Sequence, residues 1–159
     1  MNAPALVVYY DASCPLCRAE ISALADADAQ AVLRLVDCSA PAFDDPAAQA
    51  AGVSREAMMT ALHARDTAGR WHVGVDAFEA MYRAVGIESV ASLWGHPWLK
   101  PAWVRLYPWI ARNRQRLSRL GITGLFERWV RHEARRAAAR RCDAAACAVP
   151  GKQRPQRGE

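Results

Sequence analysis

The sequence has no apolar run that approaches the roughly 20 residues needed to cross a bilayer, so we expect no membrane-spanning helix. Residues 1–5 also lack the positive charge and the long apolar stretch of a secretory signal. We therefore expect a cytoplasmic protein. At 159 residues, the chain is long enough for one domain with a substantial core and too short for two ordinary domains.

Cysteine is scarce, and its number is odd. Five cysteines do not indicate a disulfide-stapled scaffold, because the cytosol keeps structural thiols reduced and a chain of this size does not need such bonds. Cysteines in such a setting more often bind a metal or perform redox chemistry. The composition therefore directs attention to where the cysteines stand.

Positive charge is almost absent from the first part of the chain and concentrated in the second. Residues 1–97 have 6 Arg, no Lys and 12 acidic residues, a net charge of −6, whereas residues 98–159 have a net charge of +11. Five of the six tryptophans follow residue 93. We therefore predict a core over 1–95, a basic, Trp-rich helical extension packed on it over 96–141, and a flexible basic tail over 142–159.

The pattern of apolar residues predicts an α/β fold whose elements follow one another as β-α-β-α-β-β-α. The first strand is a continuous apolar run, which is typical of a strand buried on both faces. The expected strands cover 6–10, 32–36, 58–64 and 70–75, and the expected helices cover 15–25, 46–52 and 76–86. This order matches the thioredoxin core, to which the extension adds helices over 97–111, 113–120 and 123–141.

The strongest chemical signal is the Cys14-Pro15-Leu16-Cys17 turn after the first strand. Pro15 suits the first position of a helix, which makes Cys14 the N-cap residue. The helix dipole alone lowers the pKa of a thiol there from ~8.5 toward ~7–8. We therefore predict that Cys14 attacks a substrate disulfide and that Cys17, covered by the helix, resolves the mixed disulfide.

Two other interpretations of this pair remain open. The cysteines could be ordinary core residues, or they could bind zinc together with Cys38, Cys142 or Cys147. Zinc ribbons usually place a glycine turn after the second cysteine, whereas here a helix continues. We therefore expect no cofactor and keep a zinc-stabilised binding module as the alternative.

Residues 10–17, with the sequence Tyr-Asp-Ala-Ser-Cys-Pro-Leu-Cys, resemble the DCC family of thiol-disulfide oxidoreductases. Residues 37–38 and the expected hairpin and helix over 69–78 add to a resemblance that covers roughly 5–120. The resemblance implies a thioredoxin-like fold and dithiol–disulfide exchange with a disulfide-containing protein or a small thiol. Thioredoxins place a cis-proline before the first hairpin strand, and residues 58–60 contain none.

Four further residues each allow a chemical and a structural role. Asp11 could accept a proton from Cys17 or cap the turn, and the capping role is favoured. Cys38 could be a second resolving thiol or a small buried residue, and burial is favoured. Cys142 and Cys147 could relay disulfides, but incidental cysteines in a tail are favoured.

The basic extension allows three interpretations. Its arginines could contact nucleic-acid phosphates, or its Trp-bearing helices could lie on an anionic membrane surface. The default is that the tryptophans pack on the core while the arginines face solvent. We expect no specific nucleic-acid partner and keep peripheral membrane contact through 94–141 as an option.

Overall fold

The computed structural model describes residues 4–119 and 122–147. It contains β1 (Leu6–Tyr10), α1 (Pro15–Ala27), β2 (Leu33–Asp37), α2 (Pro46–Ala50), α3 (Arg55–Thr60), β3 (His63–Asp66), β4 (Trp71–Val73), α4 (Val75–Ala84), α5 (Glu88–Gly95), α6 (Lys100–Arg119) and α7 (Ile122–Cys147). Among these described helices, none is both long and apolar enough to span a membrane.

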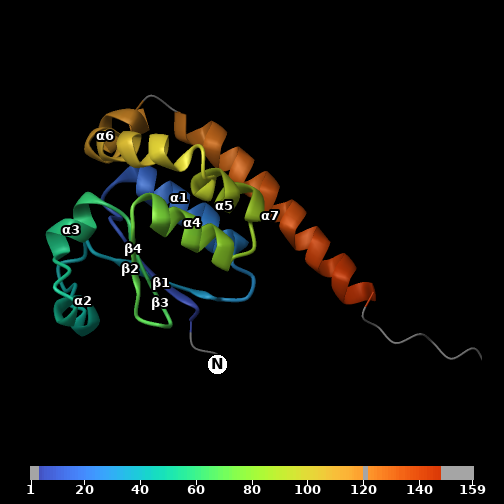
Figure 1. Cartoon of the computed structure of the whole chain (residues 1–159), viewed down its shortest axis with the longest axis horizontal. Helices are drawn as coiled ribbons and strands as arrows, with labels where there is room; N and C mark the ends of the chain where they lie inside the picture. Colours follow the sequence, from blue (N-terminus) through green and yellow to red (C-terminus); the bar gives the residue numbers. More distant parts are fainter. Residues whose placement is uncertain (1–3, 120–121, 148–159) are drawn as a thin grey trace, which may run out of the picture.

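The four strands form one mixed sheet in the order β2-β1-β3-β4. β1 runs parallel to β2 and antiparallel to β3, and β3 pairs with β4 as a hairpin. Helices α1, α4, α5, α6 and α7 gather on one side of the sheet, while α2 and α3 lie apart from them (Figure 1). The arrangement is a thioredoxin-like core with further helices, as the element order predicts.

β1 is apolar throughout because its two faces enter two different cores. Leu6 and Val8 pack in the larger core beside α1, α4 and α5. Val7 and Tyr9 point the other way, into a smaller core that includes Cys38 and Met58. Alternate residues of a strand face opposite sides of the sheet, so the C-terminal end of β1 is held rigidly from both sides.

The predicted strand over 58–64 is wrong for its first half. Residues 55–60 form the short helix α3, capped by the Ser54 hydroxyl, which accepts a bond from the Ala57 N–H. Met58 is buried in the smaller core from this helix. The strand begins only at His63, because its pairing with β1 extends from His63 to Asp66.

The connection to the next helix also differs from the prediction. Gly74, not Asp76, caps α4, with a positive φ of 59°. A Cβ atom at Gly74 would lie 2.8 Å from Cε1 of Tyr107, so glycine is required both by its conformation and by the close approach of α6. Helix α5 was not predicted and packs mainly against α4.

The C-terminal helices are longer than predicted. Residues 100–119 form one helix instead of two, with Pro108 inside it. Pro108 is exposed, so water can bind the carbonyl that loses its helical N–H partner. Helix α7 passes Arg141 and continues to Cys147, through an alanine-rich stretch of high helix propensity. The predicted tail beyond residue 147 lies outside the described residues.

Candidate active site

The cysteine pair lies where β1 passes into α1. Cys14 is the N-cap residue of α1 and Pro15 occupies its first turn, which confirms the predicted local geometry. The Arg18 N–H donates to the Cys14 carbonyl at 3.0 Å, so the helix is hydrogen-bonded from its first turn. The Cys14 side chain is 0% exposed and makes no capping hydrogen bond.

Cys17 stands on the next position of the same helix face and is partly exposed. Burial, then the neighbouring Cys14, raise the pKa of the Cys17 thiol well above its usual range, while Arg114 acts in the opposite direction. The expectation that α1 covers Cys17 is met only in part: Cys17 is half-buried, and it is more accessible than the fully buried Cys14.

Asp11 fixes the turn that carries the two cysteines. Its Oδ1 accepts bonds from the Ser13 N–H at 2.9 Å and the Ser13 hydroxyl at 2.5 Å, which is the capping role favoured for it. Its Oδ2 forms an ion pair of 2.5 Å with Arg114, and both side chains are largely buried. The same guanidinium donates to the Met59 carbonyl at 2.6 Å. Arg114 thus ties the turn that carries the two cysteines to the segment before β3.

Helix α6 closes the site at a second point. The Leu62 N–H donates to the Tyr107 hydroxyl at 2.9 Å, and burial raises the pKa of that tyrosine to about 12. Tyr107 stands two helical turns before Arg114 on α6, so both side chains reach the core from one face of the helix. Sequence reasoning missed both residues, because their partners are far away in the chain.

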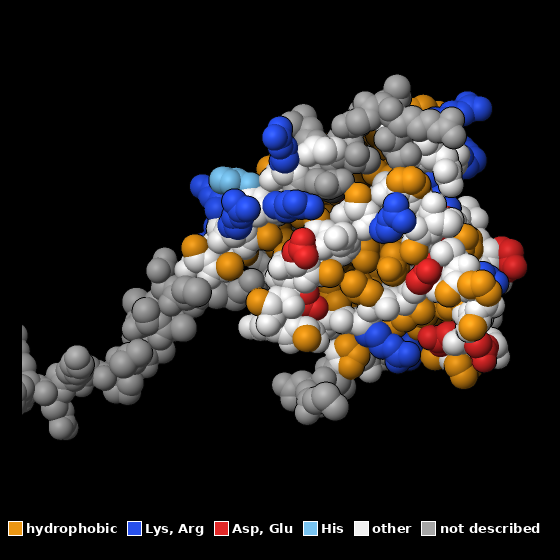
Figure 2. Space-filling model, turned by 180° about the vertical axis from the view of Figure 1, so that it is seen from behind, with side chains coloured by type: hydrophobic (Ala, Val, Ile, Leu, Met, Phe, Trp, Pro, Cys, Tyr) orange, Lys and Arg blue, Asp and Glu red, His pale blue; other side chains and the backbone are white. Residues whose placement is uncertain are grey.

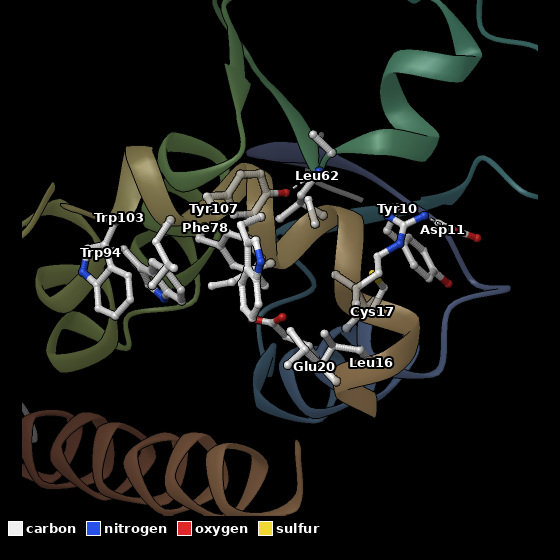
Figure 3. A pocket seen from close by; sticks show the side chains of 18 of the residues that line it. Tyr10, Asp11, Leu16, Cys17, Glu20, Leu62, Phe78, Trp94, Trp103 and Tyr107 are labelled. Atoms are coloured by element: carbon white, nitrogen blue, oxygen red, sulfur yellow. Dashed lines mark hydrogen bonds and ion pairs between the residues drawn. The ribbon is translucent and has the colours of Figure 1, made fainter. Parts of the chain in front are cut away.

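Cys17 lines a cavity of about 490 Å³ between α1, α6 and the neighbouring helices. Figure 3 shows Trp94 and Trp103 at one end of this pocket and Cys17 with Asp11 at the other. On the face drawn in Figure 2, hydrophobic side chains gather across the middle, with charged groups around them. The described lining is predominantly apolar.

Glu20 is one of the ionisable residues that line this cavity with Cys17. It stands three residues after Cys17 on α1, so the two share a helix face. The Tyr82 hydroxyl donates to its Oε1 at 3.0 Å, and burial raises the pKa of Glu20 to about 7. Sequence reasoning missed Glu20, although the three-residue spacing from Cys17 was a usable signal.

A comparison with family models matches residues 8–120 to the DCC1-like thiol-disulfide oxidoreductases. The chain belongs to this family. It is therefore a thiol-disulfide oxidoreductase, as the resemblance of its N-terminal residues implied. No curated protein and no solved structure shows significant similarity to it.

In this DCC1-like protein, Cys38 lies in the smaller core. It is fully buried, its Sγ lies 3.6 Å from the Met58 Sδ, and burial raises the pKa of its thiol to about 12. These contacts support the structural role favoured for Cys38. The backbone of residues 142–147 belongs to α7, and the side chains of Cys142 and Cys147 lie outside the described part.

The zinc alternative gains no support from the described residues. Within them, no group of three or more His, Cys, Asp or Glu side chains has an arrangement that could hold a metal ion. Around Cys17 the other titratable lining groups are Glu20, Asp11, Arg114 and the two tyrosines Tyr10 and Tyr107.

Proposed function

We propose that Cys14 and Cys17 form the redox couple of this oxidoreductase. The observation that carries the proposal is that the two cysteines stand at the N-cap and in the first turn of α1, and that Cys17 lines a cavity. A pair so placed can close a disulfide within one helical turn. The couple would alternate between dithiol and disulfide while a substrate changes in the opposite sense.

Either Cys14 or Cys17 could be the first to attack the substrate disulfide. The N-cap position favours Cys14 as the first nucleophile, as the sequence predicts. Exposure favours the opposite order, because Cys14 is 0% exposed and Cys17 borders the cavity. We therefore propose that Cys17 meets the substrate and that Cys14 resolves the mixed disulfide.

A thiol with a raised pKa needs a base at the moment of attack. Glu20 suits this role, because a pKa of about 7 makes it both a competent acceptor and a competent donor near neutrality. Asp11 suits it less, since Arg114 and Ser13 engage both of its oxygens. We assign the Cys17 proton to Glu20 and leave Asp11 the positioning of the turn.

The reaction then balances without a cofactor. Cys17 loses its proton to Glu20 and attacks one substrate sulfur, which forms a mixed disulfide and releases the other sulfur as a thiolate. Cys14 next gives its proton to the thiolate already released, attacks the Cys17 sulfur, closes the Cys14–Cys17 disulfide and releases the second substrate sulfur as a thiolate, which takes the proton held by Glu20. The substrate disulfide is reduced by two electrons and the protein dithiol is oxidised; the reverse sequence oxidises a substrate dithiol.

Trapping of the mixed disulfide tests both the couple and the order. Cys14→Ser should accumulate a substrate adduct on Cys17, and Cys17→Ser should form none, with intact mass and peptide mapping as the measurement. Cys38→Ala, which changes a thiol of the smaller core, should exchange like the wild type. Adducts on Cys14 alone would reverse the order, and full turnover by the double Cys14→Ser, Cys17→Ser variant would reject the couple.

We propose two broad classes of partner for the dithiol–disulfide couple. A disulfide-containing protein or a small disulfide would serve as oxidant of the dithiol, and a small thiol or protein dithiol as its reductant. The cytoplasmic location stays a prediction.

We also propose, as a second role, contact of the extension with an anionic membrane surface. The observation that favours it is two exposed tryptophans: Trp98, just before α6, is 87% exposed, and Trp109, within α6, is 51% exposed. The exposed Arg105 and Arg112 lie on the same helix. Co-sedimentation with vesicles rich in anionic lipid should fall several-fold in a Trp98→Ala, Trp109→Ala variant. Equal sedimentation of both proteins would reject this role.

A further inference from the structure

The cavity that holds Cys17 has a composition that selects among disulfides. We infer that its substrate is a small, uncharged organic disulfide with an apolar aliphatic or aromatic body, which the cavity holds while its sulfur faces Cys17. This inference rests on the exchange proposed for Cys14 and Cys17. It concerns the class of substrate only.

The size and walls of the cavity suit such a molecule. Its volume of about 490 Å³ lies within the roughly 300–1,000 Å³ of small-molecule sites. The far end is preformed by aromatic contacts: the rings of Phe78 and Trp94 stack at 4.9 Å, and those of Trp94 and Trp103 lie 5.1 Å apart. The Trp103 indole N–H donates to the Leu93 carbonyl at 3.0 Å, which fixes that ring.

The charges around the cavity oppose an anionic substrate. The described lining carries two carboxylates, Asp11 and Glu20, and one guanidinium, Arg114. Arg114 is already paired with Asp11 at 2.5 Å. An ionised Glu20 therefore leaves the site net negative, and a disulfide that carries carboxylates, such as glutathione disulfide, would enter against this charge.

The backbone groups beside the site are already hydrogen-bonded and so cannot pair with an extended peptide. The Leu62 N–H is bonded to Tyr107, and its carbonyl accepts from the Gly74 N–H at 2.8 Å. The Met59 carbonyl is bonded to Arg114. A peptide that binds by strand addition needs free backbone groups at such an edge. Their engagement by α6 and by Gly74 favours a small molecule over a protein segment.

Two aromatic disulfides of different charge provide the test. Reduced full-length protein is mixed with dithiodipyridine, which is neutral, or with dithiobis(nitrobenzoate), which carries a carboxylate on each ring. The difference in reaction rate between the wild type and Cys17→Ser is the rate of the Cys17 thiol. The Cys17 rate with each reagent is divided by the rate of that reagent with free mercaptoethanol. This normalised rate should be at least about tenfold higher for dithiodipyridine than for dithiobis(nitrobenzoate). Equal normalised rates would overturn the inference.

A matched pair of substitutions on α6 tests whether the cavity causes this preference. Leu106 lines the cavity and is 43% exposed, whereas Val104 lies outside the described lining and is 54% exposed. Leu106→Arg should lower the normalised ratio about fivefold, because it adds a cation at the site, and Val104→Arg should leave it unchanged. Equal effects of the two substitutions would overturn the inference.

Protein substrates separate this inference from the proposed function. When each rate at equal disulfide concentration is divided by the rate of the same disulfide with free mercaptoethanol, the Cys14–Cys17 couple should favour dithiodipyridine over the disulfides of insulin. A preference for insulin would overturn the inference while the couple stands. Failure of the Cys14–Cys17 pair to exchange with any of these disulfides would reject the proposed function itself.

Discussion

Replacement of Glu20 by Gln should remove a pH-dependent loss of stability from this protein. Gln keeps an oxygen that can accept the bond from the Tyr82 hydroxyl, which lies 3.0 Å from Oε1, but it cannot ionise. In the wild type, burial raises the pKa of Glu20 from 4.5 to about 7. The unfolded chain therefore releases this proton at lower pH than the folded protein does.

The sign and size of the effect follow from this difference. Below pH 4.5 Glu20 is neutral in both states, and the two proteins should be equally stable. As the pH rises toward 7, ionisation favours the unfolded wild type, so its stability declines relative to Glu20→Gln. The difference between 4.5 and about 7 corresponds to about 3 kcal/mol at 1.4 kcal/mol per pKa unit. Because the side chain is partly exposed, we expect about 1–2 kcal/mol.

The groups next to Glu20 that have raised pKa values do not change their charge in this pH range, so they do not affect the measured difference in stability. Cys17, Tyr82 and Tyr107 have raised pKa values and stay neutral through this range. Helix α7 contributes the uncharged Trp129 to the cavity wall.

Urea unfolding at about pH 5 and about pH 8, followed by circular dichroism, gives the free energies. Glu88→Gln serves as the control, since it removes a carboxylate that is largely exposed on α5. A gap between wild type and Glu20→Gln that does not widen with pH would refute the raised pKa, and with it the assignment of Glu20 as the base.

Three further outcomes are expected. Arg114→Ala should lose about 3 kcal/mol of stability, because it leaves the buried Asp11 carboxylate without its ion-pair partner. The same variant should be alkylated faster at Cys14. An unchanged rate of alkylation would show that α6 does not shield this sulfur. Asp45→Ala should cost about 1–2 kcal/mol, because Asp45 caps α2 and accepts a bond from the Tyr9 hydroxyl, yet leave exchange unaltered. Metal analysis of the full-length reduced protein should find no stoichiometric zinc, and one tightly bound zinc with unreactive cysteines would favour the binding-module alternative.

The local parts of the site were predictable from the sequence because they depend on neighbours in the chain. A buried strand followed by Cys-Pro-x-Cys defines both the end of β1 and the N-cap of α1. The parallel pairing of β1 with β2 follows from the strand–helix–strand order, and the structure has it. Periodicity and capping preferences are local quantities, so they locate these elements to within a residue or two.

The rest of the site depends on tertiary contacts that no local pattern contains. Arg114 lies 103 residues from Asp11, and Tyr107 lies 45 residues from Leu62. In sequence, Arg114 is one of many arginines in a basic stretch. The exposure of the two sulfurs is equally non-local, because it depends on how α6 packs over α1. The helix at 55–60 was missed for a different reason: its apolar residues also fit a short strand.

The composition of the sequence changes near residue 95 because the surface becomes basic there. This position is not the boundary of the candidate site, which includes residues of α6. The family match ends at residue 120 and so includes α6 but none of α7. Arg114 and Tyr107, both on α6, supply the bonds that hold the active-site turn and the segment before β3. The arginines that make the stretch basic are mostly exposed, whereas the residues that complete the site point inward. A chain cut after residue 95 would therefore lose the wall of the Cys17 cavity along with the basic surface, and the smallest unit expected to perform the exchange includes α6.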